Sequence, residues 1–241
     1  MLVERGEPLL LEAHLQRWQE SAALLGMAAP PGLQALMPLI QEGVKRAGLQ
    51  PGHCGALRLN WSRGCGGRGI NLPDQHDPRF WLLLTPIEPN FQPQTAHISR
   101  HERRNGDSRL SRCKTFAYGQ SIQARREARE AGADEAVLLS TGGDLCCGAV
   151  ANLLVQRQGQ WLTPPVSSGC LPGVMRGRAL QRGLAQEADL AWLADSTAPA
   201  HADQRWLLLN SLGCRPLSAV NGLPLPHLSA AEAEAFWRQL L

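Results

Sequence analysis

The order of helical and strand periodicities is the feature that most constrains the fold of this 241-residue chain. Two segments with apolar residues at helical spacing come first, each ending at a glycine, and a strictly alternating strand follows. Strands and helices are then mixed without a regular strand–helix–strand repeat, which favours an α+β fold over a doubly wound sheet. We expect helices over 9–26, 32–47, 119–131, 173–187 and from Ser229 (a capping box with Glu232), and strands over 56–62, 80–85, 136–140, 151–157, 205–210 and 217–220.

Two irregular stretches interrupt this pattern. Residues 63–69 are rich in glycine and lie between two expected strands. They lack the lysine of a P-loop and the following helix of a dinucleotide fingerprint, so we interpret them as the turn or loop between two strands. Residues 86–112 hold prolines, then charges, with no periodicity, and are the predicted linker.

Bulk properties exclude several classes of protein. The net charge is only +3, and the densest basic stretch, 100–104, is interrupted by an acid, so we expect no nucleic-acid partner. No apolar run approaches the roughly 18–20 residues that span a bilayer, and no signal-peptide pattern is present. Seven cysteines without a CxxC pair fit reduced thiols in a cytoplasmic protein. We expect Cys146 and Cys147 to point to opposite faces of a strand.

Lysine is the residue type that the sequence favours as a candidate catalytic group. The histidines lack HExxH or HxH spacing and no GxSxG elbow occurs, so neither a metal site nor a serine triad is predicted. Only two of the 24 basic residues are lysines. Lys45 lies near the end of a helix, where a solvated lysine is favoured. Lys114 lies between the predicted linker and a helix, close to the sole tyrosine, Tyr118. A partly buried amine there would have a lowered pKa and could form a Schiff base, although a structural role stays open.

Short segments in order along the chain carry a resemblance. They are HLQR at 14–17, RG at 63–64, RCKTFAY at 112–118, ADEAVL at 133–138, the stretch from 143 to 153, LPGVMR at 171–176 and NSL at 210–212. Together they resemble motifs of the class IV aminotransferase family, the fold-type IV enzymes that use pyridoxal 5'-phosphate (PLP). The match extends over nearly the whole chain.

The resemblance implies a role for each matching residue. Lys114 would be the catalytic Schiff-base lysine, and Arg17 would bind the cofactor phosphate. Leu171 would pack on the pyridine ring, while the helix that starts at Val174 and Met175 would offer N–H groups to the phosphate. The implied cofactor-binding set is Arg17, Lys114, Tyr118, Cys147, Leu171, Val174, Met175, Asn210 and Ser211.

The resemblance also implies an architecture. We expect a two-domain α+β fold of the D-amino-acid aminotransferase type, with a small N-terminal domain at 1–96, a linker at 97–112 and a larger PLP-binding domain at 113–241. PLP would lie between the domains, and a second copy of the chain would complete the site in a homodimer.

Two departures from the family pattern stand out. The family's glutamate that pairs with the pyridine nitrogen is replaced by Cys147, whose thiol stabilises a protonated ring far less. Family members also carry about 25–30 further residues at the start. We therefore expect the natural chain to begin upstream of Met1, and an in-frame reading of the preceding codons tests this.

The expected function follows from the resemblance. The NSL segment and the compact length favour an aminodeoxychorismate lyase, which converts 4-amino-4-deoxychorismate to 4-aminobenzoate and pyruvate on the folate route. The alternatives are an aminotransferase of the branched-chain or D-amino-acid type and a non-catalytic homologue. The expected partners are a small amino substrate and a second copy of the chain.

Overall fold

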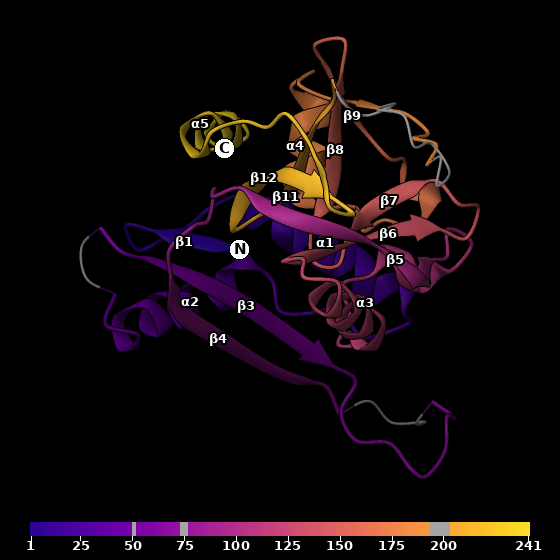
Figure 1. Ribbon diagram of the computed structural model, residues 1–241. Coiled ribbons are helices and arrows are strands. Elements are labelled where there is room, and N and C mark those ends of the chain that lie inside the picture. The colour runs from indigo at the N-terminus through magenta and orange to yellow at the C-terminus, as the bar shows by residue number, and fades with distance from the viewer. Residues whose placement is uncertain (50–51, 73–76, 193–202) are drawn as a thin grey trace. The chain divides into compact units, whose positions relative to one another are not determined.

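The structure is a computed structural model that describes residues 1–49, 52–72, 77–192 and 203–241 (Figure 1). The chain divides into two compact units, Met1–Pro89 and Asn90–Leu241. Both units mix helices with sheets, so the expected α+β class is confirmed.

The first unit is a four-stranded antiparallel sheet with two helices against it. The sheet order is β2-β1-β3-β4. A single apolar cluster joins Val3 and Leu57 of the sheet to Leu15, Leu36 and Ile40 of the helices. The elements are β1 (Leu2–Glu4), β2 (Glu7–Pro8), α1 (Leu11–Leu24), α2 (Leu33–Arg46), β3 (Cys54–Ser62) and β4 (Arg79–Ile87).

The predicted hairpin of the first unit is confirmed. Strands β3 and β4 pair antiparallel along their whole length, from Cys54 with Ile87 to Ser62 with Arg79. Gly64 has a φ of +95°, and a Cβ there would overlap with the backbone carbonyl of Asp77. The glycine therefore lets the two ends of the long connection approach each other closely, as a turn requires.

The second unit is built around a closed ring of strands. Its sheet runs β10-β9-β8-β11-β12-β5-β6-β7, and a further pairing of β7 with β8 closes a six-strand barrel. The strands are β5 (Gln94–Arg104), β6 (Glu135–Ser140), β7 (Leu145–Gly148), β8 (Asn152–Arg157), β9 (Gln160–Thr163), β10 (Gln186–Glu187), β11 (Arg205–Asn210), β12 (Gly213–Val220) and β13 (Leu223–Pro224). The helices are η1 (Arg109–Arg112), α3 (Gly119–Glu130), η2 (Val166–Ser168), α4 (Val174–Gln181) and α5 (Ala230–Arg238).

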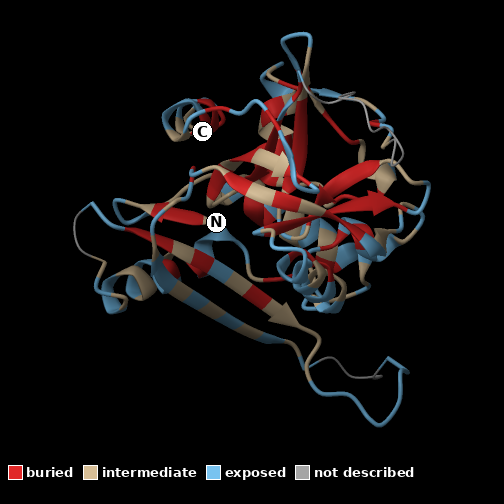
Figure 2. Cartoon of the chain, viewed as in Figure 1, coloured by how far each residue is buried: buried red, intermediate tan, exposed pale blue. Residues whose placement is uncertain are grey.

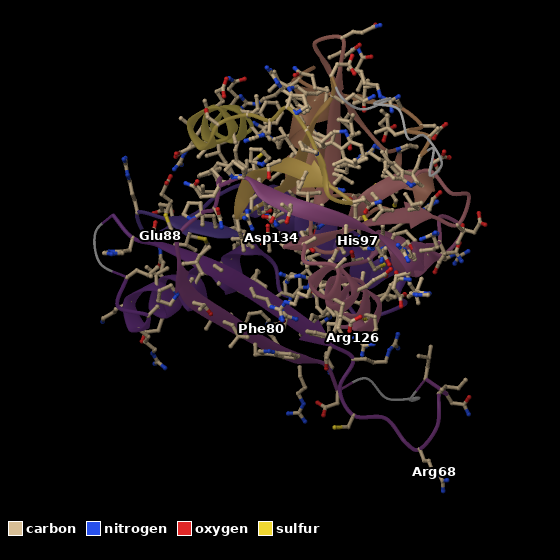
Figure 3. All side chains as sticks on the ribbon, viewed as in Figure 1. Arg68, Phe80, Glu88, His97, Arg126 and Asp134 are labelled. Carbon is tan, nitrogen blue, oxygen red and sulfur yellow. The ribbon has the colours of Figure 1, made fainter. Side chains whose placement is uncertain are left out.

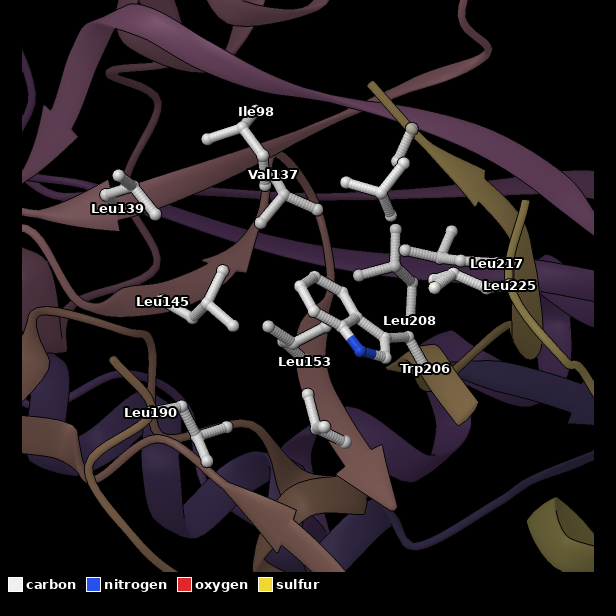
Figure 4. Packing of buried hydrophobic residues seen from close by; sticks show 13 residues of the cluster. Ile98, Val137, Leu139, Leu145, Leu153, Leu190, Trp206, Leu208, Leu217 and Leu225 are labelled. Carbon is white, nitrogen blue, oxygen red and sulfur yellow. The ribbon is translucent and has the colours of Figure 1, made fainter. Parts of the chain in front are cut away.

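Apolar side chains from all six ring strands form one core cluster, with the fully buried Trp206 among them (Figure 4). A second cluster lies between β6, β7 and α3 and contains Ala124, Ala128 and Leu138. Burial alternates along the outer strand β4 of the first unit, whereas β6 and β7 are buried at every position (Figure 2). Strand β4 thus has one covered face although its sequence is a continuous apolar run, whereas β6 and β7 have two covered faces.

Two expectations about secondary structure are wrong, and one strand was not predicted. The predicted linker at 97–112 holds most of β5 and all of η1, because β5 buries polar residues such as Gln94 and Ser99 and so lacks an apolar alternation. The helix expected over 173–187 ends at Gln181, and Gly183 follows with a φ of +67°. The strand at 136–140 pairs with β7, a strand that the sequence did not indicate.

The two adjacent cysteines also differ from expectation. Leu139 pairs with Leu145 and Leu138 pairs with Cys147, so the register shifts at Cys146. Such a bulge breaks the alternation of side chains. Cys146 and Cys147 therefore both join the cluster under α3 instead of facing opposite sides. None of the seven cysteines forms a disulfide in the structure.

Candidate active site

The turn between β7 and β8, residues 149–151, binds both the start of α3 and the predicted site residue Asn210. Its Ala149 carbonyl accepts a hydrogen bond of 2.8 Å from Ser121 Oγ in the first turn of α3. Its Val150 carbonyl accepts a hydrogen bond of 3.4 Å from Asn210 Nδ2 at the end of β11. Antiparallel pairing places Asn152, the first residue of β8, opposite Leu209. One end of the barrel thus gathers the start of α3, the β11–β12 turn and the β7–β8 turn.

The loop before α4 is fixed to the same end by Asn152. Its Nδ2 donates a 2.9 Å hydrogen bond to the carbonyl of Leu171, which also accepts from the Gly173 N–H at 2.8 Å. A Cβ on Gly173 would overlap with Asn152 Oδ1, so only glycine fits at this approach. Leu171 is half-buried, and Val174 and Met175 are buried.

Helix α4 begins directly after this loop, and Gly173 is its N-cap residue without a side-chain hydrogen bond. The N–H groups of the first turn of a helix have no partner inside the helix, and the helix dipole favours an anion there. The loop and the N-terminus of α4 can therefore accept a phosphate or a carboxylate.

Arg176 links the first turn of α4 to the segments at Pro164 and Glu187. It is 4% exposed, and its guanidinium donates to the carbonyl of Pro164 at 2.8 Å and pairs with Glu187 of β10. Among the described residues its Nε has no hydrogen-bond partner. The sequence already contained this residue in the segment LPGVMR, but its structural role was not predicted.

Lys114 lies in an irregular segment between η1 and α3. Its Nζ lies 5.7 Å from the ring centroid of Tyr118, the N-cap residue of α3. The lysine is exposed and Tyr118 is half-buried. The partial burial considered for Lys114 from the sequence is not present in this single chain.

Arg104 of β5 positions the segment that leads to Lys114. Its guanidinium donates to the carbonyl of Gly169 at 3.0 Å, to Gln120 Oε1 at 3.3 Å and to the carbonyl of Ser111 at 3.4 Å. It thus connects the loop before α4, helix α3 and η1. Sequence reasoning missed this residue because it lay in the predicted linker.

Cys147 is buried on β7 and pairs with Asn152 of β8. Its hydrogen bond with Cys146 and its burial raise the pKa of Cys147 well above the ordinary value for a thiol. The hydrogen bond from Cys147, helped by Ser168, lowers the pKa of Cys146 against the effect of burial. Cys147 therefore stays a neutral thiol at physiological pH.

The remaining predicted residues lie in two places. Asn210 and Ser211 form the β11–β12 turn and are half-buried. Asn210 Oδ1 accepts from the Leu212 N–H at 2.8 Å, so this amide stabilises the turn itself. Arg17 lies half-buried on α1, in the first unit, whereas all the other predicted site residues lie in the second.

These features define a class of protein: a mixed α+β chain with a six-strand barrel, whose strand-end loops carry a lysine amine and a helix N-terminus open to an anion. The family model described as "Amino-transferase class IV" matches residues 1–220. The chain belongs to this family.

Individual relatives are more distant. The chain is 27% identical over 173 residues to a protein of Methanocaldococcus jannaschii with the provisional name branched-chain-amino-acid aminotransferase; the match covers 71% of this chain and 59% of that protein. It is 26% identical over 184 residues to a protein of Schizosaccharomyces pombe with the provisional name aminodeoxychorismate lyase. That match covers 76% of this chain and 73% of the other protein. It thus spans less than two thirds of the first relative.

A solved structure from Legionella pneumophila is also similar. That protein carries the provisional name 4-amino-4-deoxychorismate lyase. The match has a TM-score of 0.85 at 21% identity and covers 100% of this chain and 89% of the other. It shows that the two chains share a fold. Within the described part of this chain, no helix has the length and apolar character needed to cross a membrane.

Proposed function

We propose that this chain is a PLP-dependent lyase that converts 4-amino-4-deoxychorismate to 4-aminobenzoate and pyruvate. The S. pombe and L. pneumophila proteins with lyase names support this choice, as does the NSL segment at the β11–β12 turn. The family uses PLP. We also propose, from the family, that the chain is a cytoplasmic homodimer.

The observation that carries the proposal is the loop that Asn152 fixes at the start of α4. A phosphate needs several N–H donors that point at one place, and the uncapped first turn at Val174 and Met175 supplies them. Gly173 keeps the approach to this turn open, because any larger residue would collide with Asn152. The loop therefore fits the phosphate end of PLP, and Arg17 is proposed to add a charged contact.

The lysine amine fits the other requirement of this cofactor. PLP, when bound, supplies an aldehyde for covalent attachment and a ring that withdraws electrons. Lys114 is proposed to hold the cofactor and then to move the proton whose loss permits release of pyruvate. Leu171, beside Asn152, is proposed to pack on the ring, with Tyr118 as a further contact.

Two alternatives rest on specific observations. The M. jannaschii relative favours an aminotransferase, in which Lys114 would move a proton from the α-carbon of the substrate to the aldehyde carbon of the cofactor. The neutral Cys147 favours a non-catalytic homologue, because a thiol in place of the family glutamate leaves a pyridine nitrogen without a carboxylate partner.

The two lysines provide a matched test of the cofactor site. The protein is incubated with PLP, reduced with borohydride and digested, and the modified peptide is identified by mass spectrometry. We expect the adduct on Lys114 in the wild type and in Lys45→Ala, and its loss in Lys114→Ala. An adduct distributed equally between both lysines would contradict the proposal.

A second assay separates the reactions. Pyruvate release from 4-amino-4-deoxychorismate identifies a lyase, and amination of a keto acid identifies an aminotransferase. An adduct on Lys114 with neither activity would favour the non-catalytic homologue.

A further inference from the structure

Three cations lie along one exposed side of the segment that ends at Lys114. Arg109 and Arg112 are the first and last residues of η1, and in a 3-10 helix side chains three positions apart are eclipsed. Cys113 follows with extended backbone, at φ −106° and ψ 136°. Because Cys113 is buried while Arg112 and Lys114 are exposed, these two cations share the outer side. We call Arg109, Arg112 and Lys114 the cationic ridge.

Hydrogen bonds fix the backbone of the segment that carries the ridge. Ser108 caps η1 by accepting from the Leu110 N–H at 3.3 Å, and Ser111 Oγ donates to the carbonyl of Asn105 at 2.7 Å. The Arg104 guanidinium holds the carbonyl of Ser111. The backbone that carries the cations is thus fixed, whereas the charged ends are exposed.

The two arginines have no counter-charge in the described part of the chain. No hydrogen bond or ion pair to the guanidinium of Arg109 or Arg112 is formed there, and Asp107, the acid of this loop, pairs with neither. By contrast, Arg126 on α3 (Figure 3) is exposed but pairs with Glu130 at 3.3 Å. Adjacent cations without an acid repel each other, and an anion between them relieves this repulsion.

The ridge also adjoins the loop that leads to the proposed phosphate site. Arg104 bridges Ser111 of η1 to Gly169, two residues before Leu171. Gly106 approaches the Ser167 carbonyl so closely that a Cβ there would overlap with it. Arg104 and Gly106 therefore join the segment that carries the ridge to the loop before α4.

We propose that Arg112, with Arg109 beside it, binds a carboxylate of the substrate and selects amines that carry two carboxylates. This inference rests on the proposed function, because it takes Lys114 as the amine that would hold the cofactor and that the substrate amine would displace. In extended chain, Arg112 and Lys114 are about 7 Å apart between Cα atoms, a spacing that suits an amine and a carboxylate of one small molecule. The planar guanidinium binds a carboxylate through two parallel hydrogen bonds.

Binding of a matched pair of ligands tests the proposal without requiring turnover. Glutarate and pentanoate have the same number of carbons, but glutarate carries two carboxylates. Their dissociation constants are measured by calorimetry on the PLP-loaded protein. We expect the wild type to bind glutarate about tenfold more tightly, the effect of one charge-assisted hydrogen bond. Arg112→Gln should lose most of this preference, and Arg112→Lys should retain part of it.

Arg126→Gln is the control, because it also removes one exposed positive charge from the second unit. We expect it to keep the wild-type preference for glutarate. The proposal is overturned if the wild type does not prefer glutarate, if Arg112→Gln keeps the preference, or if Arg126→Gln loses it equally. If Arg112→Gln loses the preference but still forms the PLP adduct on Lys114, the cofactor site is intact and the effect belongs to carboxylate binding alone. If the wild type forms no adduct on Lys114, both the proposed function and this inference are wrong.

Discussion

Gly173→Ala tests the loop at the start of α4 most directly. The backbone of Gly173, at φ −69° and ψ 140°, suits alanine, so the substitution introduces no backbone strain. The added methyl group, however, would overlap with Asn152 Oδ1 and lie 3.1 Å from Asn152 Cγ. Because Asn152 is 6% exposed, its amide can move only by breaking the 2.9 Å hydrogen bond to the Leu171 carbonyl.

The structure allows the cost to be estimated. Overpacking adds about 1–3 kcal/mol, loss of the hydrogen bond about 1 kcal/mol, and alanine in place of glycine at an N-cap about 0.5 kcal/mol. We expect Gly173→Ala to lower the free energy of unfolding by about 2.5–4.5 kcal/mol, the sum of these contributions. Asn152→Ala should cost about 1 kcal/mol, because the Leu171 carbonyl keeps its bond from the Gly173 N–H.

The double variant decides whether the overlap is the cause. With Asn152 reduced to alanine the methyl group at 173 has room, so the two substitutions together should cost about 2 kcal/mol, less than the sum of the single effects. Urea unfolding of the PLP-free proteins measures all four free energies, since bound PLP would add its own stabilisation. Strictly additive effects would refute the reasoning.

Two further predictions concern the second unit. Trp206→Ala should lower the free energy of unfolding by about 3–5 kcal/mol, because Trp206 is 0% exposed among the core side chains of the barrel. The control is Leu223→Ala, at a position that is 63% exposed. It should change the free energy of unfolding by less than about 0.5 kcal/mol in the same urea titration. Burial acts to raise the pKa of Glu127, but hydrogen bonds from Ser99 and the Arg100 N–H, with His101 and His97 nearby, hold it below its usual 4.5. Since the folded pKa is the lower one, Glu127 contributes stability above about pH 4.5 that is lost as the pH falls through the folded pKa. The free energy of unfolding, measured between pH 3 and 7, should fall less steeply with decreasing pH in Glu127→Gln than in the wild type. An equal slope in the two proteins would contradict this.

The site residues were predictable only where a residue's role depends on its own chemistry. Lys114 is one of two lysines, and the other lies in the last turn of a helix, so the sequence already singled it out. Its exposure depends instead on the packing of η1 and α3. Asn152 and Gly173 are far apart along the chain, and their contact required the pairing of β7 with β8.

The sequence by itself determined the mixed α+β class, the β3–β4 hairpin, the start of α5 at its capping box and the family, because periodicity, turn glycines, caps and motifs are local properties. Only the tertiary structure decided that β5 belongs to the barrel, that a bulge brings Cys146 and Cys147 into one cluster, and that Arg104 joins three segments. The physical reason is that polar strand residues and bulges are stabilised by partners distant in the sequence. Such partners leave no periodic signal in the segment itself.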